Sequence, residues 1–125
     1  MIHLDTSVLI DALTGPRRSM PELRRVVADG IRVGVSALAL YEWRRGPRTE
    51  MELAIEAALL GPDVIAAFAE AEASLAADIC RRLRRARGRE LDIAIAACAL
   101  SRGAHLWTLN RADFRGIPGL ALHSA

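Results

Sequence analysis

Apolar positions recur along the chain with two different spacings, and the changes between them predict alternating strands and helices. Short apolar runs rich in β-branched residues predict strands, whereas apolar residues three and four positions apart predict helices. Strands are expected around His3 and Leu4 and over residues 31–35, 105–109 and 120–123, with a further candidate at 63–65. Helices are expected over residues 7–14, 21–29, 36–45, 49–60, 67–86 and 92–103.

The alternation predicts an α/β fold in which helices cover both faces of a central parallel sheet of four to five strands. Gly-Pro pairs at 15–16, 46–47 and 61–62 separate the helices, and Ser36 is a good N-cap for the helix that follows it. The chain has 125 residues and no internal repeat or linker. It is therefore expected to form a single domain over residues 1–125.

The expected helix over residues 49–60 is apolar around most of its circumference. Its apolar residues include Met51, Leu53 and Leu60, and alanines occupy most of the remaining positions. Such a helix could be buried, or it could form a groove for a partner or a contact in a dimer. The pattern leaves these alternatives open.

Composition is consistent with a cytoplasmic protein. Hydrophobic residues make up 52% of the chain, which is enough for a buried core, but the longest uninterrupted apolar run, 93–100, is too short to span a bilayer. Asp5 and Asp11 interrupt the N-terminal apolar stretch and no basic region precedes it, so a signal peptide is not expected. Cys80 and Cys98 form no CxxC pair and are expected to be small buried side chains.

All 17 basic residues are arginines, and the absence of lysine excludes two classes of enzyme. A P-loop needs a lysine on the phosphates, and Schiff-base chemistry needs a lysine amine. The net charge of +2 is small, so any affinity for nucleic acid must come from local patches.

Acidic and amide side chains lie near the ends of the expected strands or at the starts of helices. Asp5 follows the first strand, Glu42 lies in the helix after the second, Asp92 opens the helix before the fourth, and Asn110 and Asp113 follow the fourth. In parallel sheets, sites form at the carboxyl ends of the strands. Carboxylates that share a cleft repel one another unless a hard cation such as Mg²⁺ or Mn²⁺ neutralises them. No cysteine–histidine cluster suggests zinc.

Each acid also has a structural interpretation that needs no metal. Asp5 could cap the helix that begins at Thr6, and Glu42 could pair with Arg45. Asp92 could interact with a helix dipole, and residues 110–113 could form a capping box. Sequence spacing alone does not bring the acids together in space.

Taken in order, five segments resemble the PIN-domain nucleases, specifically the VapC-type toxins of toxin–antitoxin systems. These are Leu-Asp-Thr-Ser-Val-Leu-Ile at 4–10, Val-Ser-Ala-Leu-Ala-Leu-Tyr-Glu at 35–42, Arg-Arg-Gly at 44–46, Asp-Ile-Ala-Ile-Ala-Ala-Cys-Ala-Leu at 92–100 and Trp-Thr-Leu-Asn-Arg-Ala-Asp-Phe at 107–114. The resemblance implies a three-layer α/β/α fold, an acidic pocket that binds Mg²⁺ or Mn²⁺, and cleavage of RNA. It also implies a small antitoxin that blocks the pocket and a toxin homodimer, which with antitoxin would form a heterotetramer or a larger assembly.

The resemblance also assigns roles to individual residues. Asp5 and Asp92 match the metal-binding aspartates, and Glu42 matches the acid of the second segment. Many PIN domains have an aspartate where this chain has Asn110, so Asp113 is expected to supply the fourth acid. This departure leaves open whether the site holds one metal or two. Thr6 matches a position whose hydroxyl orients the first aspartate.

Six arginines crowd the nine residues from Arg81 to Arg89, shortly before Asp92. One hypothesis is an RNA-phosphate track that includes Arg85 and Arg87, because arginine forks match phosphate geometry. The alternative is a solvated helix face that pairs with the acids at 70, 72 and 78.

Rival functions share parts of this pattern. Phosphatases with an aspartyl nucleophile have a second aspartate two positions after the first, but this chain has Ser7 there. A housekeeping PIN-domain nuclease that processes RNA would use the same chemistry as a toxin. A non-catalytic PIN domain that only binds RNA or protein would be favoured if Asp5 or Asp92 were missing, and both are present.

Overall fold

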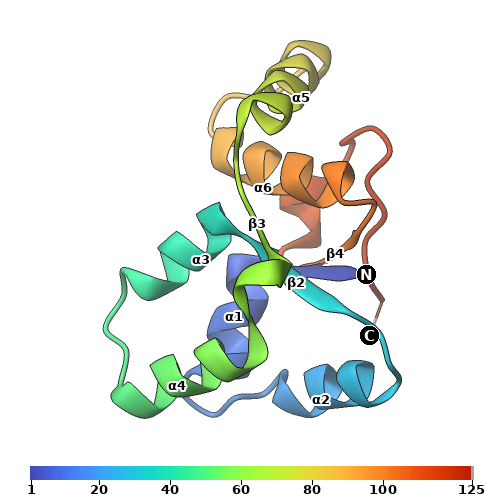
Figure 1. The fold of residues 1–125 in the computed structure, drawn as a ribbon. Coiled ribbons are helices and arrows are strands. Elements are labelled where there is room, and N and C mark those ends of the chain that lie inside the picture. The colour runs from blue at the N-terminus through green and yellow to red at the C-terminus, as the bar shows by residue number, and fades with distance from the viewer. Residues whose placement is uncertain (125) are drawn as a thin grey trace.

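Four parallel strands form the sheet around which the rest of the chain packs (Figure 1). They are β1 (Ile2–Leu4), β2 (Val33–Ser36), β3 (Ile65–Ala66) and β4 (His105–Trp107) in this computed structural model, which describes residues 1–124. The strand order is β3-β2-β1-β4, and Ile2 pairs with both Val33 and His105. The predicted parallel sheet is therefore confirmed, and β1 lies at its centre beside β4.

Two strands begin later than the sequence predicted, and one expected strand is reduced to a bridge. Residue 31 still belongs to the turn that follows the helix ending at Ala28, since its amide donates to the Val26 carbonyl. Residues 62–64 form a single 3-10 turn (η1, Pro62–Val64), which delays β3 to Ile65. The expected strand at 120–123 contributes only the bridge between Leu106 and Leu122.

All six expected helices are present, with shifted ends. They are α1 (Thr6–Leu13), α2 (Met20–Ala28), α3 (Ala37–Arg44), α4 (Glu50–Leu59), α5 (Glu70–Arg82) and α6 (Glu90–Ser101). The largest difference is α5, because the expected helix over 67–86 is shorter at both ends. Glu72 accepts a hydrogen bond from the Ala69 amide at the start of α5, and Leu83 has extended backbone angles at its end. Four of the six arginines in the 81–89 stretch therefore lie outside the helix.

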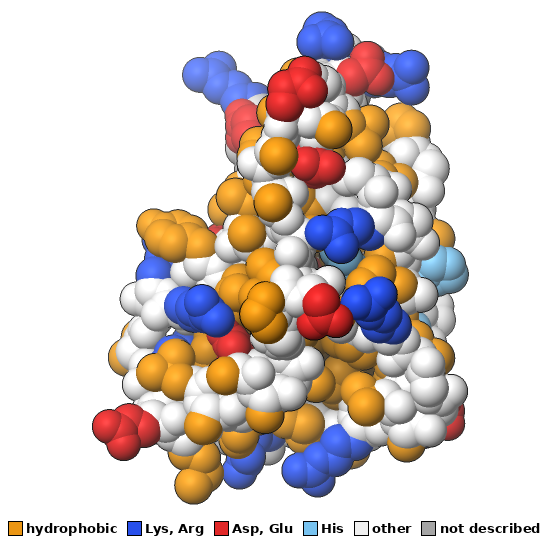
Figure 2. Space-filling view, in the orientation of Figure 1, with side chains coloured by type: hydrophobic (Ala, Val, Ile, Leu, Met, Phe, Trp, Pro, Cys, Tyr) orange, Lys and Arg blue, Asp and Glu red, His pale blue; other side chains and the backbone are white. Residues whose placement is uncertain are grey.

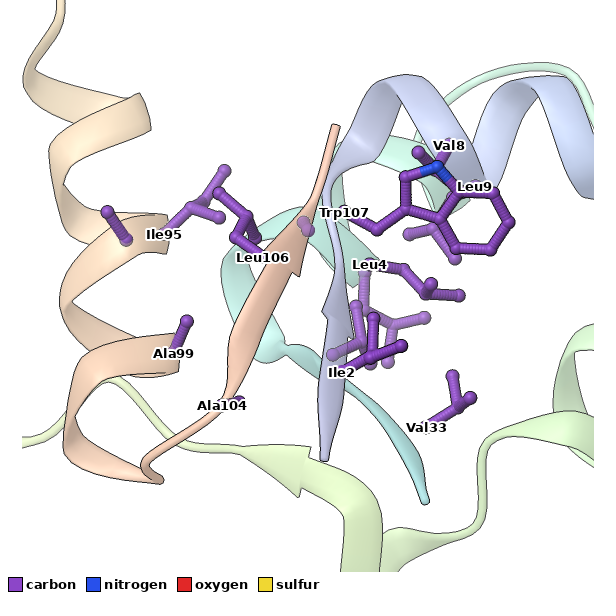
Figure 3. Packing of buried hydrophobic residues seen from close by; sticks show 14 of the residues in the cluster. Ile2, Leu4, Val8, Leu9, Val33, Ile95, Ala99, Ala104, Leu106 and Trp107 are labelled. Atoms are coloured by element: carbon purple, nitrogen blue, oxygen red, sulfur yellow. The ribbon is translucent and has the colours of Figure 1, made fainter. Parts of the chain in front are cut away.

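The helices form a layer on each face of the sheet, as the predicted three-layer architecture requires. In Figure 1, α5 and α6 lie on one face and α1, α2 and α4 on the other. Figure 3 shows why β4 can be buried on both faces: Leu106 points toward Ile95 of α6, whereas Trp107 points toward α1. Both tryptophans belong to the core, since Trp43 is 0% and Trp107 4% exposed.

Helix α4 is not a buried helix, although it is apolar. Its outward face carries Met51 and Leu53, which are 68% and 42% exposed, and the only fully buried residue on the helix is Glu56. Figure 2 shows hydrophobic side chains on the outside of the molecule over α3 and α4, interspersed with arginines. The helix expected over residues 49–60 is therefore not buried. A groove for a partner and a contact in a dimer remain as the two alternatives for its apolar surface.

Two smaller expectations concern cysteines and membranes. Cys98 is buried and Cys80 half-buried, and both are free thiols in helices. Within residues 1–124, no helix has the combined length and apolarity needed to cross a bilayer.

Candidate active site

Asp5 lies directly after β1, at the N-cap position of α1, and is only 4% exposed. Its carboxylate makes no capping bond to the helix. Instead, Oδ2 accepts hydrogen bonds from the Ser7 hydroxyl at 2.8 Å and the Thr108 hydroxyl at 2.7 Å. The helix-cap interpretation of this acid is therefore wrong, and the side chain is held at the carboxyl end of the central strand.

The two hydroxyls that hold Asp5 also join the ends of two neighbouring strands. Ser7 Oγ accepts a hydrogen bond from the Leu109 amide, and Thr108 Oγ1 accepts one from the Asn110 amide, both at 3.0 Å. Neither Ser7 nor Thr108 was expected in the site from the sequence. Ser7 lies two residues after Asp5, and Thr108 follows β4 directly. These positions were the signal in the sequence that could have assigned both residues to the site.

Glu42 reaches the same end of the sheet from the second turn of α3. The Thr6 hydroxyl donates to Glu42 Oε1 at 2.7 Å. Thr6 was expected to orient Asp5, and this expectation is wrong: α1 packs against α3, so the side chain of its first residue meets Glu42 instead. The alternative pairing with Arg45 is not found within residues 1–124, where the Arg45 guanidinium lies 6.0 Å from the Tyr41 ring centre.

Asp92 lies in the first turn of α6, and its pKa is affected by the charges of the other three acids. Its pKa is raised to about 6, first by burial and then by the negative charges of three carboxylates, which belong to Asp5, Asp113 and Glu42. Arg89 acts in the opposite direction. The other three acids that the sequence singled out, which come from three further segments, are therefore near enough for their charges to act on Asp92.

Asp113 lies on a short 3-10 helix, η2 (Arg111–Phe114), and is exposed at the rim of this site. Asn110 occupies the N-cap position of η2, but its side chain makes no capping bond, so the expected capping box is absent. The Asn110 amide instead donates to Thr108, which ties the start of η2 to the residues that hold Asp5.

The donor set fits a hard divalent cation in its chemistry. The candidate ligands are all carboxylate oxygens, although within residues 1–124 no three acidic, histidine or cysteine side chains are grouped closely enough to hold a metal ion. Mg²⁺ and Mn²⁺ prefer oxygen ligands and retain several waters, so one or two direct carboxylate ligands are sufficient for them. The neighbouring negative charges that contribute to the raised pKa of Asp92 would also attract a cation.

The first five arginines of the arginine-rich stretch divide into two groups. Arg81 and Arg82, at the end of α5, pair with Asp78 at 3.5 and 3.2 Å, and Figure 2 shows acidic and basic side chains side by side at the α5 end of the molecule. Within residues 1–124, the side chains of Arg84, Arg85 and Arg87 make no ion pair or hydrogen bond. Arg81 and Arg82 thus belong to a solvated helix face, as the alternative interpretation expected. The other two acids of that interpretation do not pair with these arginines: Glu70 accepts a hydrogen bond from the Ser74 hydroxyl, and Glu72 accepts one from the Ala69 amide.

Comparison with known proteins identifies the fold. The family model described as PIN domain matches residues 2–120, which include all four acids. None of the curated proteins compared with the chain matches it.

Solved structures similar to this chain cover nearly its whole length. A toxin–antitoxin complex from Klebsiella pneumoniae has a chain with 24% identity and a TM-score of 0.74, covering 97% of this chain and 96% of that one. DNA-bound VapBC from Salmonella typhimurium gives 25% identity and a TM-score of 0.72, with 98% and 96% covered. VapBC2 from Rickettsia felis, bound to a promoter DNA fragment, gives 22% identity and a TM-score of 0.73, with 98% of each chain covered.

Proposed function

The chain belongs to the PIN-domain family, and from this premise we propose that it is a metal-dependent endoribonuclease acting as the toxin of a toxin–antitoxin pair. The family identified in the sequence by resemblance is confirmed, and PIN domains are generally nucleases. The observation that carries the proposal is the shared electrostatic field of four acids at the carboxyl end of the sheet, expressed in the raised pKa of Asp92.

In this proposal, Asp5 and Asp92 bind the cation directly, and Glu42 and Asp113 complete its coordination partly through water. Mg²⁺ or Mn²⁺ bound there would polarise a phosphodiester oxygen and lower the pKa of a water molecule. The contribution of the chain's own residues is to orient the carboxylate of Asp5. Ser7 and Thr108 both donate to Oδ2 of Asp5, and no hydrogen bond to Oδ1 is found within residues 1–124. One oxygen is thus anchored, while the other stays available to a ligand.

The decisive experiment is replacement of Asp5 by Asn in an assay of Mn²⁺-dependent RNA cleavage. The substitution keeps the shape of the side chain and removes the charge, so activity should fall at least a hundredfold. Asp29→Asn is the matched control, because Asp29 is exposed at the end of α2. Undiminished cleavage by the Asp5 variant, in a preparation shown to be free of contaminating nuclease, would contradict the proposal.

The proposed partner is a small antitoxin, with a toxin homodimer as the core of the complex. An apolar groove of about 250 Å³ between α2 and α4 supports a protein partner; it is lined by Met20, Leu23, Arg24, Val27, Ala28 and Leu59. The structurally similar toxin–antitoxin complexes supply the class of partner.

Growth experiments separate a toxin from a housekeeping nuclease. Expression of the chain alone should arrest growth, the Asp5→Asn variant should not, and co-expression with a small open reading frame immediately upstream should restore growth. Normal growth of cells in which RNA cleavage is demonstrated would instead favour a role in RNA processing.

A further inference from the structure

Arg89 is the one arginine of the 81–89 stretch whose guanidinium is fixed by several hydrogen bonds. Nε and Nη2 donate to the Asp113 carbonyl at 3.2 and 2.9 Å, and Nη2 also donates to the Arg115 carbonyl at 2.9 Å. Nη1 donates to the Arg85 carbonyl at 3.4 Å. The side chain therefore holds three main-chain carbonyls, one from Arg85 and two from residues that lie 24 and 26 positions after Arg89.

The backbone of Arg89 is fixed as well. It occupies the N-cap position of α6, where its carbonyl accepts the Ile93 amide at 2.9 Å, and its own amide donates to the Ala86 carbonyl. Gly88 makes this turn possible with a φ of 85°, a conformation that other residues rarely adopt. Arg89 is consequently a rigid link between the start of α6 and η2.

We propose that Arg89 is a positioning residue for the acidic site: its guanidinium holds η2, and with it Asp113, against the first turn of α6, which carries Asp92. The inference rests on the proposed function in so far as the positioned carboxylates are taken to bind a cation. Arginine suits this task better than lysine, because its planar fork can donate to two carbonyls at once, whereas an ammonium has no such fixed geometry.

The charge of Arg89 and its positioning role predict opposite effects on Mn²⁺ affinity when Arg89 is replaced by alanine. The positive charge of Arg89 lowers the pKa of Asp92 and would repel a cation at the same site. If Arg89 acted only through its charge, Arg89→Ala would bind Mn²⁺ more tightly. If Arg89 positions Asp113, the same variant should bind Mn²⁺ more weakly, because supporting residues around metal ligands typically contribute about 10–100-fold in affinity.

The test is calorimetric titration of the full-length protein with Mn²⁺ in the absence of RNA. We expect Arg89→Ala to lose about tenfold or more in Mn²⁺ affinity, and Arg89→Lys, which keeps the charge but not the fork, to lose most of that amount. Arg84→Ala is the matched control and should stay within about twofold of the wild type, since the Arg84 side chain is exposed. Mn²⁺ affinity in Arg89→Ala equal to or above that of the wild type would overturn the proposal.

Amide hydrogen exchange provides a readout that does not depend on metal. In η2, the Asp113 amide donates to the Asn110 carbonyl and the Arg115 amide to the Ala112 carbonyl. Both should exchange about tenfold faster in Arg89→Lys than in Arg84→Ala, while the Leu106 amide of β4 stays protected. Unchanged exchange in η2 overturns the positioning role. A wild-type protein that binds no Mn²⁺ overturns the proposed function instead, and exchange still decides the role of Arg89.

Discussion

Thr6 and Glu42, 36 residues apart in sequence, are joined by a 2.7 Å hydrogen bond from the threonine hydroxyl to the glutamate carboxylate. The bond links the first residue of α1 to α3 and fixes the only one of the four acids that does not lie next to a strand end or a helix start. A carboxylate two turns into a helix has several rotamers, and a donated hydrogen bond selects one of them.

Thr6→Val should therefore weaken the site without removing a ligand. The variant retains the β-branched shape and loses the hydroxyl, so Glu42 is free to turn away. We expect the Mn²⁺ concentration for half-maximal RNA cleavage to rise about tenfold, while Thr6→Ser, which keeps the hydroxyl, stays near the wild type. Thr14→Val is the control, since the Thr14 hydroxyl donates only to the Ile10 carbonyl of its own helix. Identical Mn²⁺ dependence in Thr6→Val and the wild type would refute this role.

The periodicity of the sequence was sufficient for the sheet and the six helices, because apolar spacing and Gly-Pro breaks are local properties. It also located three of the four acids, since Asp5, Asp92 and Asp113 follow a strand or open a helix, whereas Glu42 lies in the second turn of α3. The periodicity could not predict the hydrogen bond from the Thr108 hydroxyl to Asp5. This bond joins residues 103 positions apart and forms because β4 pairs directly with β1.

The same limit explains why the sequence misplaced the end of α5 and could not single out Arg89. Arginine, alanine and leucine favour helix, so residues 83–86 were assigned to α5, but the chain becomes extended at Leu83 and turns through Gly88 toward Arg89. Six arginines in nine residues are equivalent in sequence, and only the tertiary structure distinguishes Arg89, which binds carbonyls, from its exposed neighbours.

The exposed arginines after α5 give a salt-dependence prediction for RNA binding. Arg85→Glu with Arg87→Glu should weaken binding and reduce the slope of log affinity against log salt by roughly 1 to 2, if each arginine neutralises one phosphate. The control is Arg81→Glu with Arg82→Glu, which makes the same change in net charge at two arginines already paired with Asp78. Equal loss of slope in both double variants would show a general charge effect rather than a track.

Asp92 predicts a pH-dependent difference in stability. Its pKa rises from 3.8 to about 6 on folding, so ionisation of this carboxyl destabilises the metal-free fold progressively as pH rises through this range. Asp92→Asn should thus be more stable than the wild type at pH 7.5, by about 1 kcal/mol once the shift is discounted for partial exposure.

Urea denaturation without metal at pH 3.5 and pH 7.5 checks this prediction, because the difference should disappear below the unfolded pKa. His3, whose pKa is lowered to about 4 by burial, titrates in both proteins and cancels in the comparison. Saturating Mn²⁺ should reverse the order by stabilising the wild type alone. A difference that is the same at both pH values would assign the effect to packing instead of charge.

The buried carboxylate of Glu56 gives the last prediction, which concerns how α4 is attached to α3. Arg44 Nε lies 2.5 Å from Glu56 Oε1, and the glutamate side chain is 2% exposed against 51% for the arginine. Glu56 Oε2 is buried and has no hydrogen-bond partner within residues 1–124. The pair therefore consists of an arginine that can return to water and a carboxylate that cannot.

Removal of the two partners should have unequal effects on the free energy of unfolding. Arg44→Ala leaves an uncompensated buried carboxylate and should cost about 3 kcal/mol, whereas Glu56→Met replaces that carboxylate by an apolar side chain of similar length and should cost less than about 1 kcal/mol. Urea denaturation at pH 7.5 measures both, with Arg25→Ala as the control because Arg25 belongs to a solvent-exposed pair with Glu22. If Glu56→Met were as unstable as Arg44→Ala, the ion pair itself would be what stabilises the α3–α4 contact. The expected order would instead mean that Arg44 serves mainly to neutralise a carboxylate that α4 buries.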